Sequence, residues 1–329
     1  MKQLSVVVDR LSRQGKNNLA VTLVPADQET LPAWQAGDHI DLFLPNQLIR
    51  QYSLTGCPNE QNEYLICVKK EQQSRGGSRY VHEQLRVGQT LNISLPRNAF
   101  PLVAAQRYIL LAAGIGITPL LAFAEQLDAQ QTPFELFYYV KDLEDVAFKK
   151  RWQRGFKHGR CHLVFSNHGQ SVRHGLPEIC HQANPHTQLY LCGPEAFMQH
   201  CQLQAMQLGW SADQIQQEAF APSQSKSLET NPASAEFRVI LRSTGQSFEV
   251  PANKSIAQTL IEQNIAVPVS CEMGMCGACL TRVYQGEVDH QDTVQTENEK
   301  NAAEQYVALC CSRAKSAVLE IAWLCCTKI

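Results

Sequence analysis

The chain contains 329 residues, a length that accommodates two or three domains of ordinary size. Its 29 Lys and Arg residues nearly balance 31 Asp and Glu residues, and the net charge of −2 argues against a nucleic acid or an anionic membrane as partner. The 13 cysteines are odd in number, and residues 1–10 lack the apolar core of a signal peptide. We therefore expect a metal centre in a reducing cytoplasm rather than a disulfide framework.

The first hundred residues are predicted to be β structure, because short alternating or β-branched runs are separated by Gly, Pro and Asn. The predicted strands are residues 5–8, 19–24, 39–44, 64–68 and 91–95. Only residues 78–85 have a helical pattern. This spacing is typical of a small antiparallel β-barrel, which we assign to residues 1–103.

From about residue 107, apolar runs of strand length alternate with helical segments, which predicts a doubly wound parallel α/β domain over residues 104–221. The strands are expected at 108–112, 134–140, 161–165 and 188–192, and the helices at 120–127, 145–154 and 195–208. The uncharged stretch 108–124 is too short to span a bilayer, so we expect no membrane segment.

A polar stretch rich in Ser, Pro and Asn covers residues 222–235 and is predicted to be a linker. A third domain is expected over residues 236–329. It begins with a predicted hairpin at 237–241 and 247–250, followed by a helix that Ser255 caps and that extends to about residue 264.

The cysteine pattern of this third domain is the most specific motif in the sequence. Three cysteines have the C-x4-C-x2-C spacing with which plant-type ferredoxins bind a 2Fe–2S cluster, and a fourth follows some thirty residues later. Gly274 and Gly277 allow the loop to turn tightly and bring amide groups close to the sulfur atoms. The predicted ligands are Cys271, Cys276, Cys279 and Cys310.

A glycine-containing turn follows the first apolar strand of the α/β region. Gly114 and Gly116 lack Cβ, so a cofactor has room against the backbone, and the next helix offers N–H groups to negative charge. A second turn, at 192–194 (CGP), follows a late strand of the same sheet. Ligands of such sheets bind outside the carboxyl ends of the strands, which predicts a dinucleotide site at both turns. The alternative is a tight β-to-α turn without a ligand.

Two acidic residues, Asp142 and Asp145, follow the strand that ends at residue 140. If they border an adenosine ribose, their charge disfavours a 2′-phosphate and favours NADH over NADPH. Lys141 lies beside them, and a solvated loop is the competing interpretation.

Two strings in the β region carry the residue types of a further cofactor site. In RQYSL at 50–54, Arg50 and Tyr52 share one face of a strand and Ser53 points to the other. In RGGSR at 75–79, two glycines, a hydroxyl group and two guanidinium groups precede a helix, a combination suited to a phosphate. An ordinary surface strand and a charged turn are the alternatives.

Six strings follow one another along the chain: RQYSL, SRGGS, GIGITP, LCGP, CEMGMCGAC and LCCSRA. In this order, over essentially the whole chain, they resemble the phthalate dioxygenase reductase family, relatives of ferredoxin–NADP reductases with a C-terminal plant-type ferredoxin module. The resemblance implies a ferredoxin-reductase-like barrel that binds FMN, an NAD domain, and a β-grasp domain that holds the 2Fe–2S cluster.

The resemblance also assigns residues. The implied flavin contacts are Arg50, Tyr52, Ser53, Leu54 and Phe220, with Gly77, Ser78 and either Arg75 or Arg79 at the FMN phosphate. The implied contacts around the nicotinamide are Gly114, Gly116, Thr118, Cys192, Gly193 and Pro194. Asp142 is the candidate for the ribose from its position after a strand, apart from the resemblance. Thr118 and Ser53 are the candidates for hydrogen bonds near flavin N5 during catalysis. The family pattern favours Cys310 over Cys311, and neighbours on a strand point oppositely, so only one is able to ligate.

The implied activity is a relay. NADH delivers two electrons together as hydride, a 2Fe–2S cluster accepts one at a time, and a flavin connects the two. By resemblance, the final acceptor is a Rieske-type oxygenase component that acts on an aromatic acid, an O-methyl aromatic or a quaternary amine such as carnitine.

Two departures from the family pattern and three alternatives remain. Ala113 stands where the family usually has Gly, and the pair Cys325-Cys326 has no assigned role. The alternatives are an FAD-type electron-transfer subunit of another dehydrogenase, a non-enzymatic iron–sulfur carrier or sensor, and a self-sufficient oxygenase. The long gap before the fourth cysteine argues against the first alternative. A carrier or sensor would not need the two cofactor-binding domains. A self-sufficient oxygenase would need a haem or facial-triad ligand set, which the sequence lacks.

Overall fold

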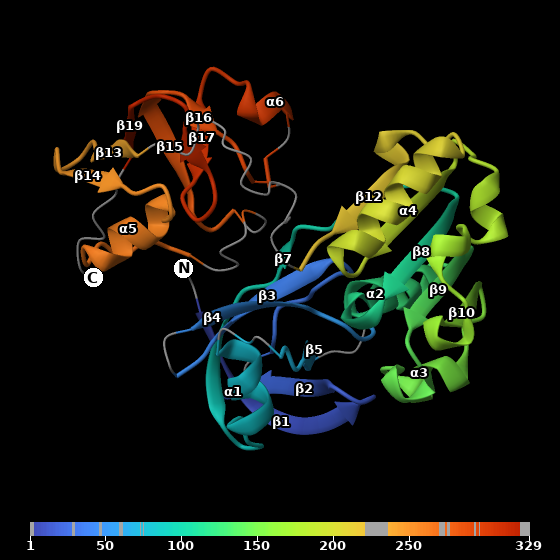
Figure 1. Cartoon of the computed structure of the whole chain (residues 1–329). Helices are drawn as coiled ribbons and strands as arrows, with labels where there is room; N and C mark the ends of the chain where they lie inside the picture. The colour runs from blue at the N-terminus through green and yellow to red at the C-terminus, as the bar shows by residue number, and fades with distance from the viewer. Residues whose placement is uncertain are drawn as a thin grey trace. The chain divides into compact units, whose positions relative to one another are not determined.

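The computed structural model describes residues 3–27, 30–45, 48–58, 62–72, 74, 76–220, 236–269, 274, 277–292, 294–295 and 297–322. The chain forms two compact units, Met1–Ala221 and Pro222–Ile329 (Figure 1). The predicted linker at 222–235 and the pair Cys325-Cys326 lie outside the described residues.

The first part of the Met1–Ala221 unit is a curled antiparallel sheet. Its strands are β1 (Gln3–Gln14), β2 (Asn18–Pro25), β3 (Asp38–Phe43), β4 (Ile49–Ser53), β5 (Tyr64–Lys69), β6 (Thr90–Ser94) and β7 (Arg97–Asn98). They are ordered β4-β3-β6-β1-β2-β5, with β7 paired to β3. A bridge between Thr55 and Leu65 joins the end of β4 to β5, and the helix α1 (Gly77–Glu83) follows β5. The predicted barrel is thus confirmed.

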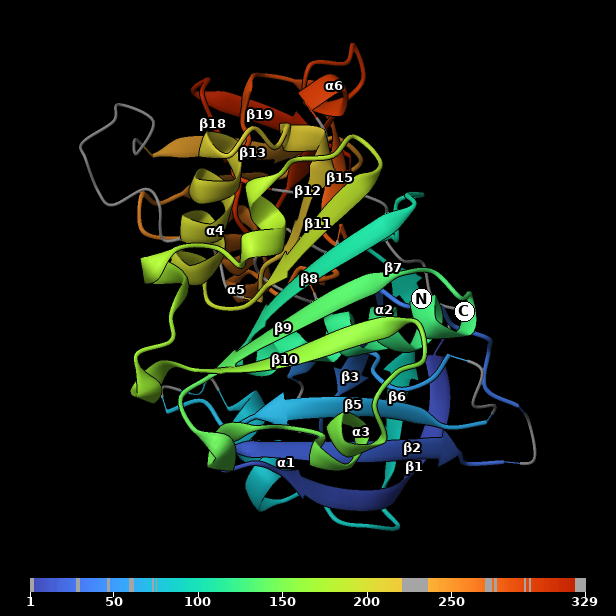
Figure 2. The ribbon, with the colours of Figure 1, turned by 90° about the vertical axis from the view of Figure 1, so that its right-hand side faces the viewer.

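The second part of this unit is a five-stranded parallel sheet in the order β10-β9-β8-β11-β12, which Figure 2 shows as a fan of adjacent strands. The strands are β8 (Arg107–Ala113), β9 (Phe134–Val140), β10 (Gly159–Phe165), β11 (Thr187–Cys192) and β12 (Ile215–Glu218). The helices are α2 (Ile117–Ala129), α3 (Lys149–Arg154) and α4 (Glu195–Gln207).

The two faces of this sheet are covered separately, because alternate residues of β8 point to opposite sides. Leu110 belongs to the core that contains Phe123 of α2 and the barrel residues. Leu111 belongs to a second core with Met198 and Cys201 of α4. The sheet is therefore doubly wound, as predicted.

The connection after β9 differs from the helix expected at 145–154. A short 3-10 turn, η2 (Leu143–Asp145), comes first, closed by a capping box between Asp142 and Asp145. Phe148 then adopts a left-handed backbone with φ of 57°, and α3 begins only at Lys149. The reciprocal cap starts the turn at Asp142, and the extended backbone of Val146 ends it, so the segment does not continue into a longer helix.

The Pro222–Ile329 unit has a mixed sheet in the order β14-β13-β19-β15-β17. Its elements are β13 (Phe237–Leu241), β14 (Ser247–Val250), α5 (Ile256–Glu262), β15 (Leu280–Gln285), β16 (Val288–Asp289), α6 (Glu297–Lys300), β17 (Gln305–Ala308), β18 (Arg313–Ala314) and β19 (Val318–Ile321). β13 and β19 run parallel, whereas β14 and β15 run antiparallel to their neighbours. Ser255 caps α5 in a capping box with Gln258, as the sequence predicted.

This unit has its own apolar core. Val239, Leu319 and Ile321 of the sheet pack with Ile256 and Leu260 of α5, and each is at most 1% exposed. A mixed sheet with parallel central strands and a helix on one face is the β-grasp arrangement expected for a plant-type ferredoxin domain.

Candidate cofactor-binding sites

Three strands of the parallel sheet end side by side. β8 ends at Ala113, β11 at Cys192 and β12 at Glu218, with Cys192 paired to Ala112 on one side and to Glu218 on the other. The chain passes from β8 to β9 on one side of β8, whereas β11 lies on its other side. Such a reversal of strand order opens the crevice in which ligands of α/β sheets bind. Both predicted turns begin at this point.

The two turns are in direct contact, and this contact requires glycine. A Cβ atom at Gly116 would lie 2.2 Å from the carbonyl oxygen of Cys192. A Cβ atom at Gly193 would lie 2.8 Å from the methyl group of Ala113. The chain therefore accommodates Ala113, the departure from the family pattern, because the residue opposite has no side chain.

The barrel contributes to the same edge through Ser53 at the end of β4. The Ser53 hydroxyl group donates a hydrogen bond of 3.4 Å to Oε2 of Glu218. Burial raises the pKa of Glu218 to about 8, and the hydrogen bond from Ser53 acts in the opposite direction. A carboxyl group that stays protonated near neutral pH is thus held beside the predicted flavin residue Ser53.

Sequence reasoning assigned no role to Glu218. The available signal was its position, since an acidic residue in a strand end two residues before Phe220 lies next to a residue already assigned to the flavin. Phe220 itself is partly buried and packs against the core that the barrel and α2 share.

Two residues of the predicted nicotinamide site, Thr118 and Cys192, are buried, whereas Gly114 and Pro194 are exposed. Cys192 is fully buried, and burial raises the pKa of its thiol far above the ordinary value, so the sulfur stays neutral. Pro194 is the N-cap residue of α4. Thr118 is 2% exposed, and its hydroxyl group donates to the carbonyl oxygen of Ile115 at 3.1 Å. This contact directs the Thr118 hydroxyl group to the glycine turn that precedes α2, and its role towards a flavin stays a prediction.

On β4, the residues alternate as the sequence predicted. Arg50 pairs with Leu42 and Tyr52 with Ile40 of β3. Burial raises the pKa of the Tyr52 phenol to about 12, so the phenol keeps its proton. The side chain of Leu54 is fully buried and belongs to the core. Its N–H group donates to the carbonyl oxygen of Asp38.

The predicted phosphate turn lies against Arg50. A Cβ atom at Gly77 would come within 2.6 Å of Arg50 Cγ, so glycine is needed for the guanidinium stem to cross the start of α1. Ser78 donates to Ser74 Oγ at 2.9 Å. The structure thus brings Arg50, Gly77 and Ser78 together from distant strings, whereas Arg75 lies outside the described residues.

At the end of β9, Asp142 lies in a polar group with two residues that follow β10. Asn167 donates to Asp142 Oδ2 at 2.5 Å, and His168 Nε2 lies 3.7 Å from Oδ1. Both residues were missed from the sequence because they belong to a separate 3-10 turn, η3 (Ser166–His168).

In the Pro222–Ile329 unit, strand pairing brings two predicted cluster ligands together. β15 begins directly after Cys279 and pairs antiparallel with β17, with Leu280 opposite Ala308. Cys310 follows two residues beyond Ala308, and the Leu309 amide donates to the carbonyl oxygen of Cys279 at 3.4 Å. Cys271 and Cys276 lie outside the described residues.

The described residues fit a thiolate-bound cluster. The amide of Gly274 donates to Cys310 Sγ at 3.3 Å, the kind of hydrogen bond that stabilises a cluster thiolate. Gly274 and Gly277 have φ values of 72° and 71°, which glycine adopts without strain. A Cβ atom at Gly274 would also lie 2.4 Å from Cys311 Sγ, so the choice of Cys310 over Cys311 as the fourth ligand stays a prediction.

Comparisons with known proteins agree with this architecture. A model described as a 2Fe-2S iron-sulfur cluster binding domain matches residues 239–315, and an oxidoreductase NAD-binding domain model matches residues 110–203. A vanillate O-demethylase oxidoreductase from Acinetobacter baylyi is 38% identical over 322 residues, covering 98% of this chain and 99% of the relative. A phthalate dioxygenase reductase from Burkholderia cepacia is 36% identical over 297 residues, covering 88% of each chain.

A solved structure is similar over the full length. It is a phthalate dioxygenase reductase described as modular for electron transfer from pyridine nucleotides to a 2Fe–2S centre, with a TM-score of 0.70, 33% identity and 98% coverage of both chains. Fold, sites and matches together define an NAD-dependent iron–sulfur oxidoreductase. The chain belongs to the phthalate dioxygenase reductase family. No helix in the described part of the chain has both the length and the apolar character needed to cross a bilayer.

Proposed function

We propose that this chain is the NADH-dependent reductase component of a two-component Rieske-type oxygenase system. Electrons pass from NADH through FMN and the 2Fe–2S cluster to a separate oxygenase. The observation that carries the proposal is the meeting of the Gly116 and Cys192 turns with Ser53 of the barrel, in a chain that also has the cysteine pattern of a ferredoxin. When bound, FMN supplies the conversion of hydride transfer into single-electron transfer.

The residues around the flavin act by binding and orientation. Arg50, Gly77 and Ser78, with Arg75 or Arg79, hold the FMN phosphate, since a guanidinium group and backbone amides are the donors that a phosphate prefers. Tyr52 keeps its proton and contributes an aromatic surface with a hydrogen-bond donor. Phe220 covers the flavin, and Leu54 supports the strand from the core side.

On the nicotinamide side, Gly114, Gly116 and Gly193 keep the crevice open to a planar ring. The neutral Cys192 thiol and Pro194 border the ring without adding charge. Ser53 and Glu218 are a hydrogen-bonding pair that would lie near the flavin, and Thr118 would provide a second hydroxyl group there. Asp142 accepts from the adenosine ribose and disfavours the 2′-phosphate of NADPH.

The remaining assignments follow from the same account. We place the FMN domain at 1–103, the NAD domain at 104–221, the linker at 222–235 and the ferredoxin domain at 236–329. Cys271, Cys276, Cys279 and Cys310 bind the cluster. The partner is an oxygenase component for an aromatic acid, an O-methyl aromatic or a quaternary amine, and the compartment is the cytoplasm.

The experiment that tests this function is reconstitution of turnover. Purified chain, NADH and candidate Rieske oxygenases are combined, and product formation is measured against the same mixture with Cys310→Ser chain. The proposal predicts turnover with one substrate class only in the presence of intact chain. Acid extraction should release FMN. Recovery of FAD instead, with no turnover by any oxygenase, would support the alternative of an electron-transfer subunit for another dehydrogenase.

A further inference from the structure

A buried carboxylate, Asp292, lies in the loop between β16 and α6 of the ferredoxin unit. It is 3% exposed, a burial that requires several hydrogen-bond donors around an ionised carboxyl group. The Ser312 hydroxyl donates to Oδ1 at 3.1 Å, and the Gln295 backbone amide donates to Oδ2 at 3.1 Å. The Gln295 side-chain amide contacts both oxygens at 3.2 Å, and His290 Nδ1 lies 3.4 Å from Oδ1.

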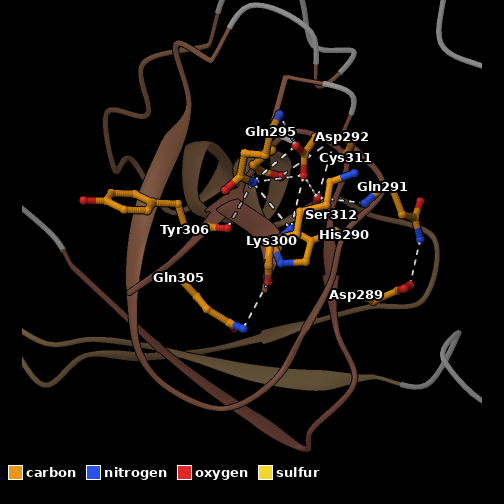
Figure 3. Close-up of polar contacts among 11 residues, drawn as sticks. Asp289, His290, Gln291, Asp292, Gln295, Lys300, Gln305, Tyr306, Cys311 and Ser312 are labelled. Atoms are coloured by element: carbon orange, nitrogen blue, oxygen red, sulfur yellow. Dashed lines mark hydrogen bonds and ion pairs between the residues drawn. The ribbon is translucent and has the colours of Figure 1, made fainter. Parts of the chain in front are cut away.

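Figure 3 shows the side chains of Asp292, Gln295 and Ser312 pointing toward one another, whereas Asp289 lies apart from this group. Ser312 is fully buried and follows Cys310 by two residues. The Ser312 hydroxyl also accepts from the Gln291 amide at 3.1 Å, so both ends of the hydroxyl group are used by the 291–292 segment. The position of the turn after Cys310 is therefore fixed by this segment.

The same segment also contacts Gly274, which lies between Cys271 and Cys276 in the sequence. The Val294 amide donates to the carbonyl oxygen of Gly274 at 3.1 Å, and the Gly274 amide in turn donates to Cys310 Sγ at 3.3 Å. A Cβ atom at Gly274 would come within 2.9 Å of the Asp292 backbone, so Gly274 and Asp292 are in close contact. Gln291, Asp292 and Val294 thus contact both Gly274, which lies between two predicted ligands in the sequence, and Ser312, which follows the fourth.

We propose that Asp292 is a positioning residue for the fourth cluster ligand. Through Ser312 it fixes the Cys310 turn, and through the backbone contact with Gly274 it keeps the amide of that residue directed at the Cys310 sulfur. The inference rests on the proposed function only in requiring the 2Fe–2S cluster.

The test uses the full-length holoprotein as Asp292→Asn, Asp292→Ala and Ser312→Ala, with Asp289→Asn as the matched control. The rate at which an iron chelator bleaches the cluster absorption is compared with the rate of unfolding followed by far-ultraviolet circular dichroism. We expect cluster loss about tenfold faster or more in the three variants, because each loses a hydrogen bond to a charged group. Unfolding should stay at the wild-type rate, and Asp289→Asn should match the wild type in both rates.

A second readout is the electron paramagnetic resonance spectrum of the dithionite-reduced cluster. The Asp292→Asn and Ser312→Ala spectra should change, since the surroundings of Cys310 change, while the Asp289→Asn spectrum should not. If Asp292→Ala does not accumulate, Asp292→Asn and Ser312→Ala carry the test.

The proposal is overturned if the variants lose the cluster at the rate of Asp289→Asn, or if their unfolding accelerates in proportion to cluster loss. Reduction by dithionite requires neither NADH nor an oxygenase. A wild-type cluster that NADH does not reduce would therefore contradict the proposed function while the test of Asp292 stands.

Discussion

Replacement of Glu218 by Gln is predicted to remove a pH dependence from the stability of the Met1–Ala221 unit. Burial raises the pKa of Glu218 from 4.5 to about 8. Above pH 4.5 the unfolded chain loses this proton while the folded chain keeps it, so folding takes up a proton. The stability contribution of Glu218 is therefore complete below pH 4.5 and decreases as the pH rises towards 8.

The size of this effect follows from the two pKa values. A rise from 4.5 to about 8 corresponds to about 5 kcal/mol of folding free energy, at about 1.4 kcal/mol per pH unit. Glu218 keeps partial contact with solvent, which makes this figure an upper limit. The hydrogen bond from Ser53 lowers the pKa of Glu218. In Ser53→Ala, the decrease in stability should therefore continue to a pH above 8.

The assay is urea unfolding of the full-length chain from pH 5 to pH 9 at a fixed saturating FMN concentration, which keeps the contribution of ligand binding constant. Tryptophan fluorescence reports the unfolding of the first unit through Trp34, Trp152 and Trp210. Glu218→Gln should match the wild type at pH 5 and become progressively more stable than the wild type towards pH 8. The exposed Glu144→Gln should follow the wild type throughout. A constant difference between Glu218→Gln and the wild type at all pH values would refute the reasoning.

Three further changes give distinct outcomes. Cys310→Ser should abolish the visible cluster absorption and Cys311→Ser should preserve it, and the reverse result would overturn the ligand assignment. Gly116→Ala should destabilise the chain by about 3 kcal/mol in urea unfolding, because a methyl group would meet the Cys192 carbonyl oxygen at 2.2 Å. A methyl group at Gly114 would meet no other atom, and only the φ of 55° disfavours alanine there, so Gly114→Ala should lower the stability by about 1 kcal/mol. Equal losses of stability in the two variants would contradict the packing argument. Asp142→Ala should raise kcat/KM for NADPH about tenfold relative to NADH, because a charge near the 2′-phosphate is removed, and an unchanged ratio would remove Asp142 from cofactor selection.

The fold could be predicted largely because its signals are local. The apolar run at 134–140 coincides with β9, and the Ser255 cap marks the start of α5 within one residue. The start of α3 could not be predicted, because it depends on the extended backbone of Val146, which ends η2, and on the left-handed backbone of Phe148, which precedes α3.

The candidate sites also have features that could be predicted and features that could not. Glycine turns and cysteine spacing are visible in the sequence because the chemistry needs those residue types close together. Contacts between distant segments are not visible in the sequence. Ser53 and Glu218 are 165 residues apart in the chain, and only the docking of the barrel on the parallel sheet brings them within hydrogen-bond distance. Asp292 and Ser312 meet through the pairing of the strands around them.

The measurement that tests the central claim most directly is an anaerobic stopped-flow reaction of the wild-type holoprotein with NADH, followed at flavin and cluster wavelengths. The account predicts that flavin absorption decreases first, that cluster absorption then decreases, and that Cys310→Ser retains the first phase and lacks the second. Oxidised spectra that persist after NADH is added, or a cluster that is reduced while the flavin is absent, would contradict it.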